Sequence, residues 1–177
     1  MVGPSGKILQ SGDLSNWVLE SSGTSSALNA VANSGEIYVA VGYAGTVLTS
    51  TDGATWVPRA SGVTDSLYNV KYIHGKFVAV GAAGAVIYST DGKSWNVTRA
   101  GASDLKSVSY STVSGSWIVV GTLGTIYVST DLVSWSPRTI SNVTGTLYDV
   151  ASNDTTTMIV GYNGKIFSSA NLNLFIS

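Results

Sequence analysis

Ser50-Thr51-Asp52-Gly53-Ala54-Thr55-Trp56 is the clearest copy of a short motif that recurs along this chain of 177 residues. We call it the Ser-x-Asp motif. Its copies begin at residues 11, 50, 89, 129 and 169, so consecutive copies lie 39 or 40 residues apart. The five copies are Ser11–Trp17, Ser50–Trp56, Ser89–Trp95, Ser129–Trp135 and Ser169–Phe175. A regular spacing of this length indicates an array of structural repeats.

One repeat contains four segments with the character of short strands. In the third repeat these are Leu67–Ile73, Lys76–Val80, Ala85–Ser89 and Ser94–Thr98, separated by glycine-containing turns such as Asp91-Gly92. Runs of this kind, joined by tight turns, predict antiparallel hairpins. Four such strands in about 40 residues make one blade of a β-propeller. We therefore expect an all-β propeller of four-stranded antiparallel blades, without long helices.

Two further patterns repeat in the same frame. The second strand of each repeat ends in Val-Gly-x-x-Gly, where glycine would permit a tight turn or a close approach of backbones. The copies are Val2–Gly6, Val41–Gly45, Val80–Gly84, Val120–Gly124 and Val160–Gly164. The first strand carries Leu-x-x-Val, which we interpret as packing between blades. Its copies are Leu28/Val31, Leu67/Val70, Leu105/Val108 and Leu147/Val150.

The repeat frame predicts a single array over residues 1–177, with an incomplete N-terminal blade. The blade units are approximately 1–22, 23–61, 62–101, 102–141 and 142–177. One alternative is four closed blades, with residues 146–161 pairing to the N-terminal hairpin and Lys165–Ser177 left over. We favour five units, the first lacking its two inner strands. An unpaired strand edge promotes association, so we expect a homo-oligomer that completes this blade.

The composition suits strands that are buried on both faces. Charged residues make up 11% of the chain, against about 25% in an ordinary globular domain, and the net charge is −1 without a basic run. Binding to nucleic acid depends on Lys and Arg that neutralise phosphates. We therefore expect no nucleic-acid partner.

The sequence also limits the compartment and the kinds of site. It contains no cysteine, which excludes disulfides and thiolate metal sites. No apolar stretch reaches the roughly 18 residues of a membrane span, so no membrane partner is expected. Residues 1–6, Met-Val-Gly-Pro-Ser-Gly, lack the charged and apolar regions of a signal peptide. The localisation stays open between a chain that is cytoplasmic as made and a component of a virion or surface assembly.

The Ser-x-Asp motif resembles the Asp-box, or BNR, repeat of the sialidase superfamily, of secreted glycan-active proteins and of photosystem II assembly factors. The common form has four residues between Asp and Trp, whereas Asp52 and Trp56 are separated by three. Compact repeats of this kind are similar to those in phage and bacterial surface proteins. The resemblance implies a structural role on the outer rim for Asp13, Asp52, Asp91 and Asp131. We expect these carboxylates to accept backbone N–H groups and each Trp to bury a large apolar area. The last copy has Asn171 and Phe175 instead.

A sialidase-like site would need three arginines that converge on one carboxylate. The chain has only Arg59, Arg99 and Arg138, which follow the motif Trp by three or four residues. They would occupy matching places on outer strands of separate blades. This arrangement argues against convergence and favours solvated charges on the edge.

The chain also has few residues from which other kinds of catalytic site could be built. A glycosidase needs two carboxylates a few ångströms apart, and a pair among Asp65, Asp104, Asp149 and Asp154 is geometrically conceivable. His74 is the only histidine and falls in a turn, which argues against a Ser-His-Asp triad and a two-His metal site. We therefore predict no enzyme, no catalytic residue, no metal and no cofactor.

The loop face of the propeller is the expected place for a ligand. Its turns are rich in Ser, Thr, Asn, Gly and Tyr, which suit adaptable hydrogen bonding and aromatic stacking. The candidate binding residues are Tyr43, Tyr162 and Asn163, with Tyr68 and Tyr148 at matching positions of the first strand.

These observations favour a non-catalytic binding or scaffold propeller that recognises a glycan or a protein, plausibly in a phage virion or bacterial surface protein. The alternatives are a photosystem-assembly-factor-like propeller, a sialidase-like glycosidase, and an engineered or reconstructed repeat protein. The assembly-factor alternative predicts a basic patch, which the few Lys and Arg residues disfavour.

Overall fold

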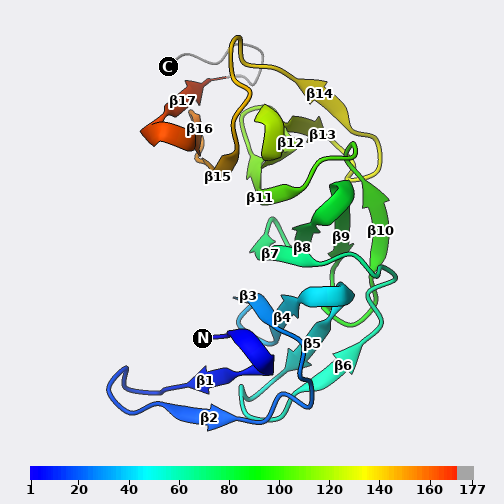
Figure 1. The fold of residues 1–177 in the computed structure, drawn as a ribbon, viewed down its shortest axis with the longest axis vertical. Helices are drawn as coiled ribbons and strands as arrows, with labels where there is room; N and C mark the ends of the chain where they lie inside the picture. The colour runs from blue at the N-terminus through cyan, green and yellow to red at the C-terminus, as the bar shows by residue number, and fades with distance from the viewer. Residues whose placement is uncertain (171–177) are drawn as a thin grey trace. The chain divides into compact units, whose positions relative to one another are not determined.

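The computed structural model describes residues 1–170 as a succession of antiparallel sheets in which consecutive strands pair (Figure 1). The first sheet holds β1 (Ile8–Gln10) and β2 (Val18–Glu20). The second holds β3 (Leu28–Asn33), β4 (Tyr38–Gly42), β5 (Val47–Ser50) and β6 (Val57–Arg59). The third holds β7 (Leu67–Ile73), β8 (Lys76–Gly81), β9 (Ala85–Ser89) and β10 (Asn96–Arg99). The fourth holds β11 (Leu105–Ser111), β12 (Ser116–Gly121), β13 (Ile126–Ser129) and β14 (Ser136–Arg138). The fifth holds β15 (Leu147–Ser152), β16 (Thr157–Gly161) and β17 (Ile166–Ser169).

A short 3-10 turn precedes the third strand of each repeat. The five turns are η1 (Pro4–Gly6), η2 (Tyr43–Gly45), η3 (Ala82–Gly84), η4 (Thr122–Gly124) and η5 (Tyr162–Gly164). These turns are the only helical elements in the described part of the chain. The predicted all-β architecture, with four-stranded sheets and an incomplete N-terminal one, is therefore confirmed.

The two end sheets have fewer described strands than the three sheets between them. β16 pairs with β17, with Thr157 opposite Ser169 and Val160 opposite Ile166. β15 and β16 thus form a sheet with β17, and the described strands make up five sheets. The sheet of β1 and β2 is preceded only by a short bridge between Val2 and Ile8.

The last strand of a repeat begins later than predicted. β10 starts at Asn96, directly after Trp95, whereas the pattern predicted a strand from Ser94. The reason is the turn of the Ser-x-Asp motif, whose Asp91 holds the backbone N–H groups of Lys93 and Ser94. Those groups cannot at the same time join a strand ladder.

The described residues form two compact units. Unit 1 contains Met1–Ala79 and Ile87–Val97, and unit 2 contains Val80–Val86 and the residues from Thr98 on. Each unit has its own apolar core, built where the first strand of one repeat packs on the sheet before it.

The Leu-x-x-Val residues are buried, as predicted, except Val31, which is 38% exposed. In unit 1, Leu67 and Val70 pack with Val39, Val41 and Val47. In unit 2 the corresponding cluster is Leu147, Val150, Ile118, Val120 and Ile126.

A β-bulge explains how residues three apart face the same core. Successive side chains of a regular strand alternate between faces, so residues i and i+3 would point to opposite sides. The pairing of β3 with β4 shifts between Leu28 and Ala30, and that of β15 with β16 shifts between Leu147 and Asp149. The extra residue restores Leu28 and Val31 to one face.

Candidate functional site

The turns η1 to η5 carry most of the predicted binding residues, and their backbone geometry is the same in every repeat. The middle residue of each turn lies in the left-handed region, with φ between 50° and 58°. Those residues are Ser5, Ala44, Ala83, Leu123 and Asn163. Asparagine tolerates this conformation better than most residues, which suits Asn163 to its position.

Two glycines hold η2 close to its neighbours. A Cβ on Gly42 would collide with the carbonyl oxygen of Ala27, and one on Gly45 would collide with that of Val63. Gly45 also has a positive φ of 66°. The predicted reasons for glycine, close approach and left-handed geometry, therefore both apply in the Val-Gly-x-x-Gly segment.

In unit 1, Tyr43 is presented at the start of η2 with 56% of its surface exposed. Its backbone N–H donates to the carbonyl of Ala27 at 2.9 Å, and its carbonyl accepts from Thr46 Oγ1 at 2.7 Å. Tyr68 follows Leu67 on β7 and is half-buried. Because η2 lies against β7, the structure brings the segments that carry Tyr43 and Tyr68 together.

In unit 2, Tyr162 and Asn163 open η5 and Tyr148 lies on β15. The N–H of Tyr162 donates to the carbonyl of Thr146 at 2.9 Å. The ammonium of Lys165 lies 5.3 Å from the centre of the Tyr162 ring, within the range of a cation–π contact. Tyr148 is 58% exposed, and Asn163 is exposed beside the half-buried Tyr162.

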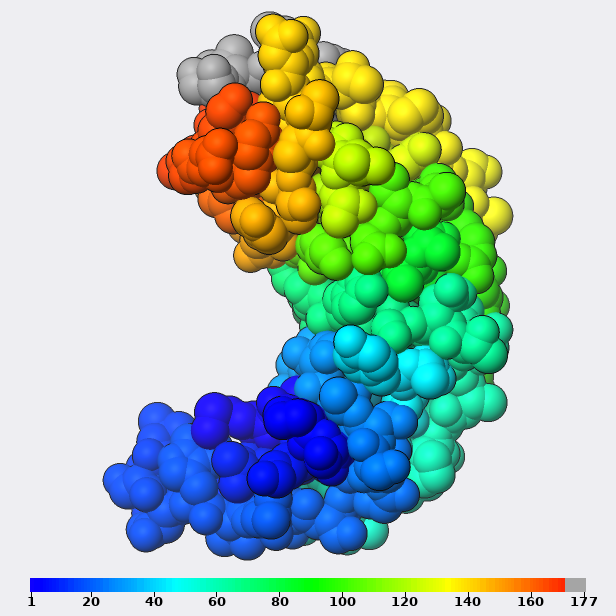
Figure 2. Space-filling view, in the orientation of Figure 1, coloured from blue at the N-terminus to red at the C-terminus, as the bar shows by residue number. Residues whose placement is uncertain are grey.

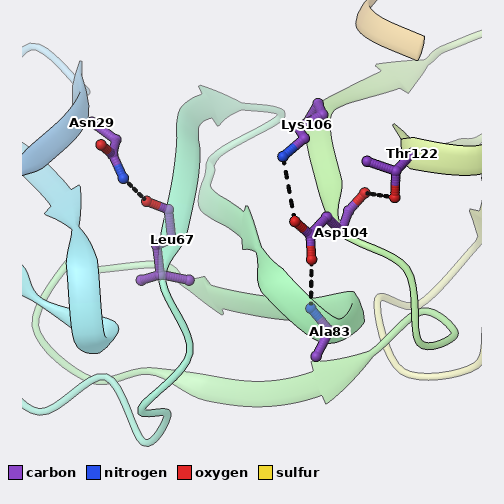
Figure 3. A network of polar contacts seen from close by, with 6 residues as sticks. All are labelled: Asn29, Leu67, Ala83, Asp104, Lys106 and Thr122. Carbon is purple, nitrogen blue, oxygen red and sulfur yellow. Dashed lines mark hydrogen bonds and ion pairs between the residues drawn. The ribbon is translucent and has the colours of Figure 1, made fainter. Parts of the chain in front are cut away.

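Hydrogen bonds fix the connections that flank the turns (Figure 3). Asp104 accepts from the N–H of Ala83 at 3.2 Å and pairs with Lys106 at 3.5 Å. Its carbonyl accepts from Thr122 Oγ1 at 3.4 Å. In unit 1 the amide of Asn29 donates to the carbonyl of Leu67 at 2.7 Å, which ties β3 to β7. The loop face is therefore a set of anchored turns.

The acidic residues considered for catalysis are engaged in structural contacts. Asp149 on β15 accepts from the hydroxyl of Ser107 and from the backbone N–H of Val150. Asp154 accepts from the hydroxyl of Thr112 at 2.8 Å. Within residues 1–170, no group of three or more His, Asp or Glu side chains is arranged to hold a metal ion.

The Ser-x-Asp motif lies at the opposite end of the third strand from the 3-10 turn. Asp52 Oδ1 accepts from the N–H groups of Thr55 and Ala54 and from the Ser50 hydroxyl, at 2.8 to 2.9 Å. These bonds, led by that of Thr55, lower the pKa of Asp52 to about 2.

The same arrangement recurs in the other described copies of the motif. Ser94, Lys93 and Ser89 lower the pKa of Asp91 to about 2. The pKa values of Asp13 and Asp131 are lowered by equivalent bonds, the largest from Asn16 and Ser134 respectively. Carboxylates held so firmly in the ionised form do not act as general acids near neutral pH. The fifth copy, with Asn171 and Phe175, lies outside the described residues.

The tryptophans of the motif are less buried than predicted. Trp56 and Trp95 are half-buried, and each donates its indole N–H to the carbonyl of the residue after the motif Asp, at 2.9 and 3.1 Å. Trp17 is 41% exposed, so the expectation of a well-covered ring is wrong there. The reason is that β1 and β2 lack the inner strands present in the second sheet.

The arginines make contacts near their own strands. The Nε of Arg59 donates to Thr49 Oγ1 at 3.0 Å, and Nη1 of Arg138 donates to the carbonyl of Pro137 at 3.0 Å. Arg99 donates to the carbonyl of Ala83 at 2.7 Å. These contacts are local and structural.

A groove in unit 1 was missed by the sequence reasoning about ligands. Its volume is about 240 Å³, and it lies beside the inner edge of β1. Its walls include Gln10, Val31, Tyr38, Gly53 and Trp56. The hairpin tip between β1 and β2, blue in Figures 1 and 2, projects from the rest of unit 1 in this view. The incomplete first repeat is the sequence feature from which this groove could have been predicted.

No helix among residues 1–170 has the length and apolar character needed to cross a membrane. No family model and no curated protein matches this chain.

Solved structures give the clearest comparison, and they show the fold. A structure of YCF48 bound to a D1 peptide superposes with a TM-score of 0.71 at 19% identity, covering 99% of this chain and 61% of that one. The WD40 β-propeller domain of Doa1 gives a TM-score of 0.76 at 14% identity, covering 96% and 60%. The computationally designed Ika4 protein gives 0.66 at 15% identity, covering 82% and 92%. The β-propeller fold is thus confirmed, and this chain spans about three fifths of the YCF48 and Doa1 chains.

Proposed function

We propose that this chain is a non-catalytic binding or scaffold propeller whose anchored turns recognise a polypeptide. The observation that carries the proposal is the presentation of Tyr43. Its ring is exposed while its backbone is held on both sides by Ala27 and Thr46. An aromatic side chain on a backbone that is already fixed loses less entropy on binding than one on a mobile loop, which suits an interface anchor.

Tyr162 and Asn163 form a second anchor of the same design in unit 2. Tyr162 supplies an aromatic face beside a cation, and Asn163 supplies amide donors and an acceptor in an exposed left-handed position. The low charge of the chain favours a partner recognised by hydrogen bonds and stacking. The YCF48 structure, which contains a D1 peptide, supports a peptide over other classes of partner.

A glycan is the second candidate partner, because tyrosine faces also stack on sugar rings and the turns are rich in hydroxyl and amide groups. The resemblance of the Ser-x-Asp motif to Asp-box repeats supports this candidate. Membership of a phage virion or a bacterial surface assembly, in which the chain acts as a homo-oligomeric scaffold, is part of the same proposal.

Arrays of peptides and of glycans, probed with the wild-type protein and with Tyr43→Ala and Tyr162→Ala, test the proposal. We expect a set of peptides to be retained by the wild type and to be weakened at least tenfold by one of the two substitutions. Val57→Ala is a suitable control, because Val57 is 42% exposed on the outer strand β6. Retention of glycans alone would move the assignment to the second candidate. Turnover of a glycoside by the wild type would overturn the non-catalytic assignment.

A further inference from the structure

Another groove in unit 1 lies beside the Ser-x-Asp motifs, and we call it the motif-side groove. Its volume is about 430 Å³, within the roughly 300–1,000 Å³ of small-molecule sites. Its walls come from the β3–β4 hairpin, the β7–β8 hairpin and the motif that begins at Ser89. The residues that line it include Glu36, Tyr72, Asp91 and Lys93. These segments all belong to unit 1, so one compact body holds the whole groove.

An aromatic ring forms part of one wall. Tyr72 lies near the end of β7 and is 39% exposed. The centre of its ring lies 4.8 Å from that of Phe77, at an angle of 51°, and Phe77 itself is buried. Phe77 therefore supports the tyrosine ring while part of that ring stays open to the groove. A braced aromatic face of this kind is suited to stacking on a flat apolar surface.

Two opposite charges face the same groove. Glu36 and Lys93 both line it and both are exposed. Neither side chain forms an ion pair or a hydrogen bond with another residue of the described range 1–170. In the repeat frame, Gly75 takes the place of Glu36 in the following repeat, and Val133 takes the place of Lys93. The two charges therefore distinguish this groove and are not a general feature of the repeat.

Asp91 supplies a further acceptor. Its Oδ1 accepts hydrogen bonds from two backbone N–H groups and from the hydroxyl of Ser89. These bonds lower the pKa of Asp91 to about 2, so the carboxylate is ionised near neutral pH. Its Oδ2 accepts no hydrogen bond from residues 1–170, which leaves this oxygen available to a ligand. Thr51 and Thr90 add hydroxyl groups to the walls.

The backbone of these walls is already hydrogen-bonded. The N–H groups of Glu36 and Ile37 donate to the Ser34 hydroxyl at 3.3 and 3.2 Å. The N–H of Lys93 donates to Asp91 at 2.8 Å. A peptide that binds along a strand depends on main-chain hydrogen bonds, whereas these walls offer mainly side-chain groups. They therefore favour a ligand that carries its own hydroxyl groups.

The motif-side groove adjoins a second one. This neighbour has a volume of about 350 Å³ and shares Ile37, Thr51 and Lys93 with the first. It extends to Arg59, which adds a second cationic side chain. The two together could accept several units of a chain-like ligand.

We propose that the motif-side groove binds a neutral oligosaccharide. A sugar ring has an apolar face that stacks on an aromatic ring, and its edge carries hydroxyl groups that donate and accept hydrogen bonds. Tyr72 provides the stacking face. Glu36 and Asp91 accept from sugar hydroxyl groups, and Lys93 donates to them. Both signs of charge line the groove, which favours a neutral glycan over an anionic one. The site shares no residue with the turns η2 and η5 and does not depend on their proposed role.

An array of neutral oligosaccharides that includes cellotetraose, maltotetraose and chitotetraose, probed with the whole chain, tests the proposal. Titration calorimetry then measures the Kd of each retained sugar. We expect Tyr72→Ala to weaken binding at least tenfold and Tyr72→Phe, which keeps the ring, to stay within about threefold of the wild type. Glu36→Gln is expected to weaken binding at least threefold. Glu20→Gln removes the same charge from β2, outside the groove, and is expected to leave binding unchanged.

Changes in backbone amide chemical shifts locate the sugar on the wild-type chain and do not depend on the folding of a variant. We expect the amides of Thr51, Thr90 and Lys93 to shift more than that of Tyr43. Retention of no neutral oligosaccharide, equal binding by Tyr72→Ala, or shifts confined to the turns would overturn the proposal. So would retention of anionic glycans or charged peptides alone. Tyr43→Ala is expected to weaken only peptide binding and Tyr72→Ala only sugar binding, so the two proposals can fail separately.

Discussion

Ser50 and Asp52 hydrogen-bond to one another at 2.9 Å, and the hydroxyl of Ser50 also accepts the buried N–H of Gly53 at 2.8 Å. One hydroxyl thus serves both the carboxylate and the backbone of the turn. The same distances join Ser89 to Asp91, and the same pattern joins Ser129 to Asp131. In these three repeats the Ser-x-Asp motif is therefore a hydrogen-bonding unit that closes the outer hairpin.

Replacing Ser50 with alanine is expected to destabilise the protein by about 1–3 kcal/mol, because it leaves a buried N–H without an acceptor. Chemical denaturation monitored by tryptophan fluorescence measures this change in the free energy of unfolding. Thr51→Ala changes the neighbouring exposed residue of the same motif and is expected to stay within about 0.5 kcal/mol of the wild type. Equal effects of the two substitutions would contradict the assigned role of the hydroxyl.

The Ser-x-Asp motif also predicts sensitivity to acid. The pKa of Asp52 and of Asp91 is about 2 in the folded protein, below the ordinary value of 3.8. A lowered folded-state pKa contributes stability that is present above the unfolded value and is lost as the pH falls through the folded value. We therefore expect the melting temperature to fall most steeply between about pH 4 and pH 2.

Asp52→Asn is expected to lower the melting temperature at pH 7 and to make its decline below pH 4 shallower. Glu36→Gln removes the same charge outside the motif and controls for net charge. Thermal melts of the three proteins from pH 7 to pH 2 provide the measurement. An unchanged slope in Asp52→Asn would show that other groups govern the acid transition.

The residue after the motif Asp provides a second internal comparison. Leu14 and Leu132 have φ values of 62° and 65°, where Gly53 and Gly92 stand in two other copies. A left-handed conformation costs a non-glycine residue about 1–2 kcal/mol. Leu14 is 80% exposed, whereas Leu132 is 1% exposed.

We therefore expect opposite outcomes from the same substitution at these two positions. Leu14→Gly is expected to stabilise the protein by about 0.5–1 kcal/mol, since relief of backbone strain exceeds the added freedom of the unfolded chain. Leu132→Gly is expected to destabilise by about 2 kcal/mol, because lost core packing exceeds the same relief. Denaturation curves of both variants measure the change in the free energy of unfolding. Changes of the same sign in the two variants would refute the explanation.

Much of this fold could be predicted from the chain because each repeat marks its own turns. The predicted strands Leu67–Ile73 and Ala85–Ser89 coincide with β7 and β9. The bulge between Leu28 and Ala30 was not predictable from alternation, since an inserted residue changes the period that alternation assumes. The spacing of Leu and Val, three residues apart, was the only sequence feature that indicated the bulge.

The candidate site was less accessible to sequence reasoning. The composition of the turns favoured Tyr43 and Tyr162 as exposed residues, but the bonds that anchor them come from Ala27 and Thr146, in other segments of the chain. The groove beside β1 was harder to predict, because it is defined by strands that the first sheet lacks. The exposed fraction of Val31 is much larger than that of Val70, and this difference indicates the groove.

Gly42 and Gly3 give the sharpest test of the crowding around the turns. Both lie in the same motif with extended backbone, at φ −166° and −167°, so neither needs glycine for its conformation. A Cβ on Gly42 would collide with the carbonyl oxygen of Ala27 and lie 2.9 Å from Leu28 Cα. No atom lies within 4 Å of a Cβ on Gly3.

Gly42→Ala is expected to destabilise by about 2–3 kcal/mol, because rigid backbone has to move to accommodate one methyl group. Gly3→Ala is expected to change stability by no more than about 0.5 kcal/mol. Thermal denaturation at a protein concentration low enough to keep the chain monomeric compares them directly. If Gly3→Ala were as damaging as Gly42→Ala, the glycines would be required for a reason other than the close approach of Ala27.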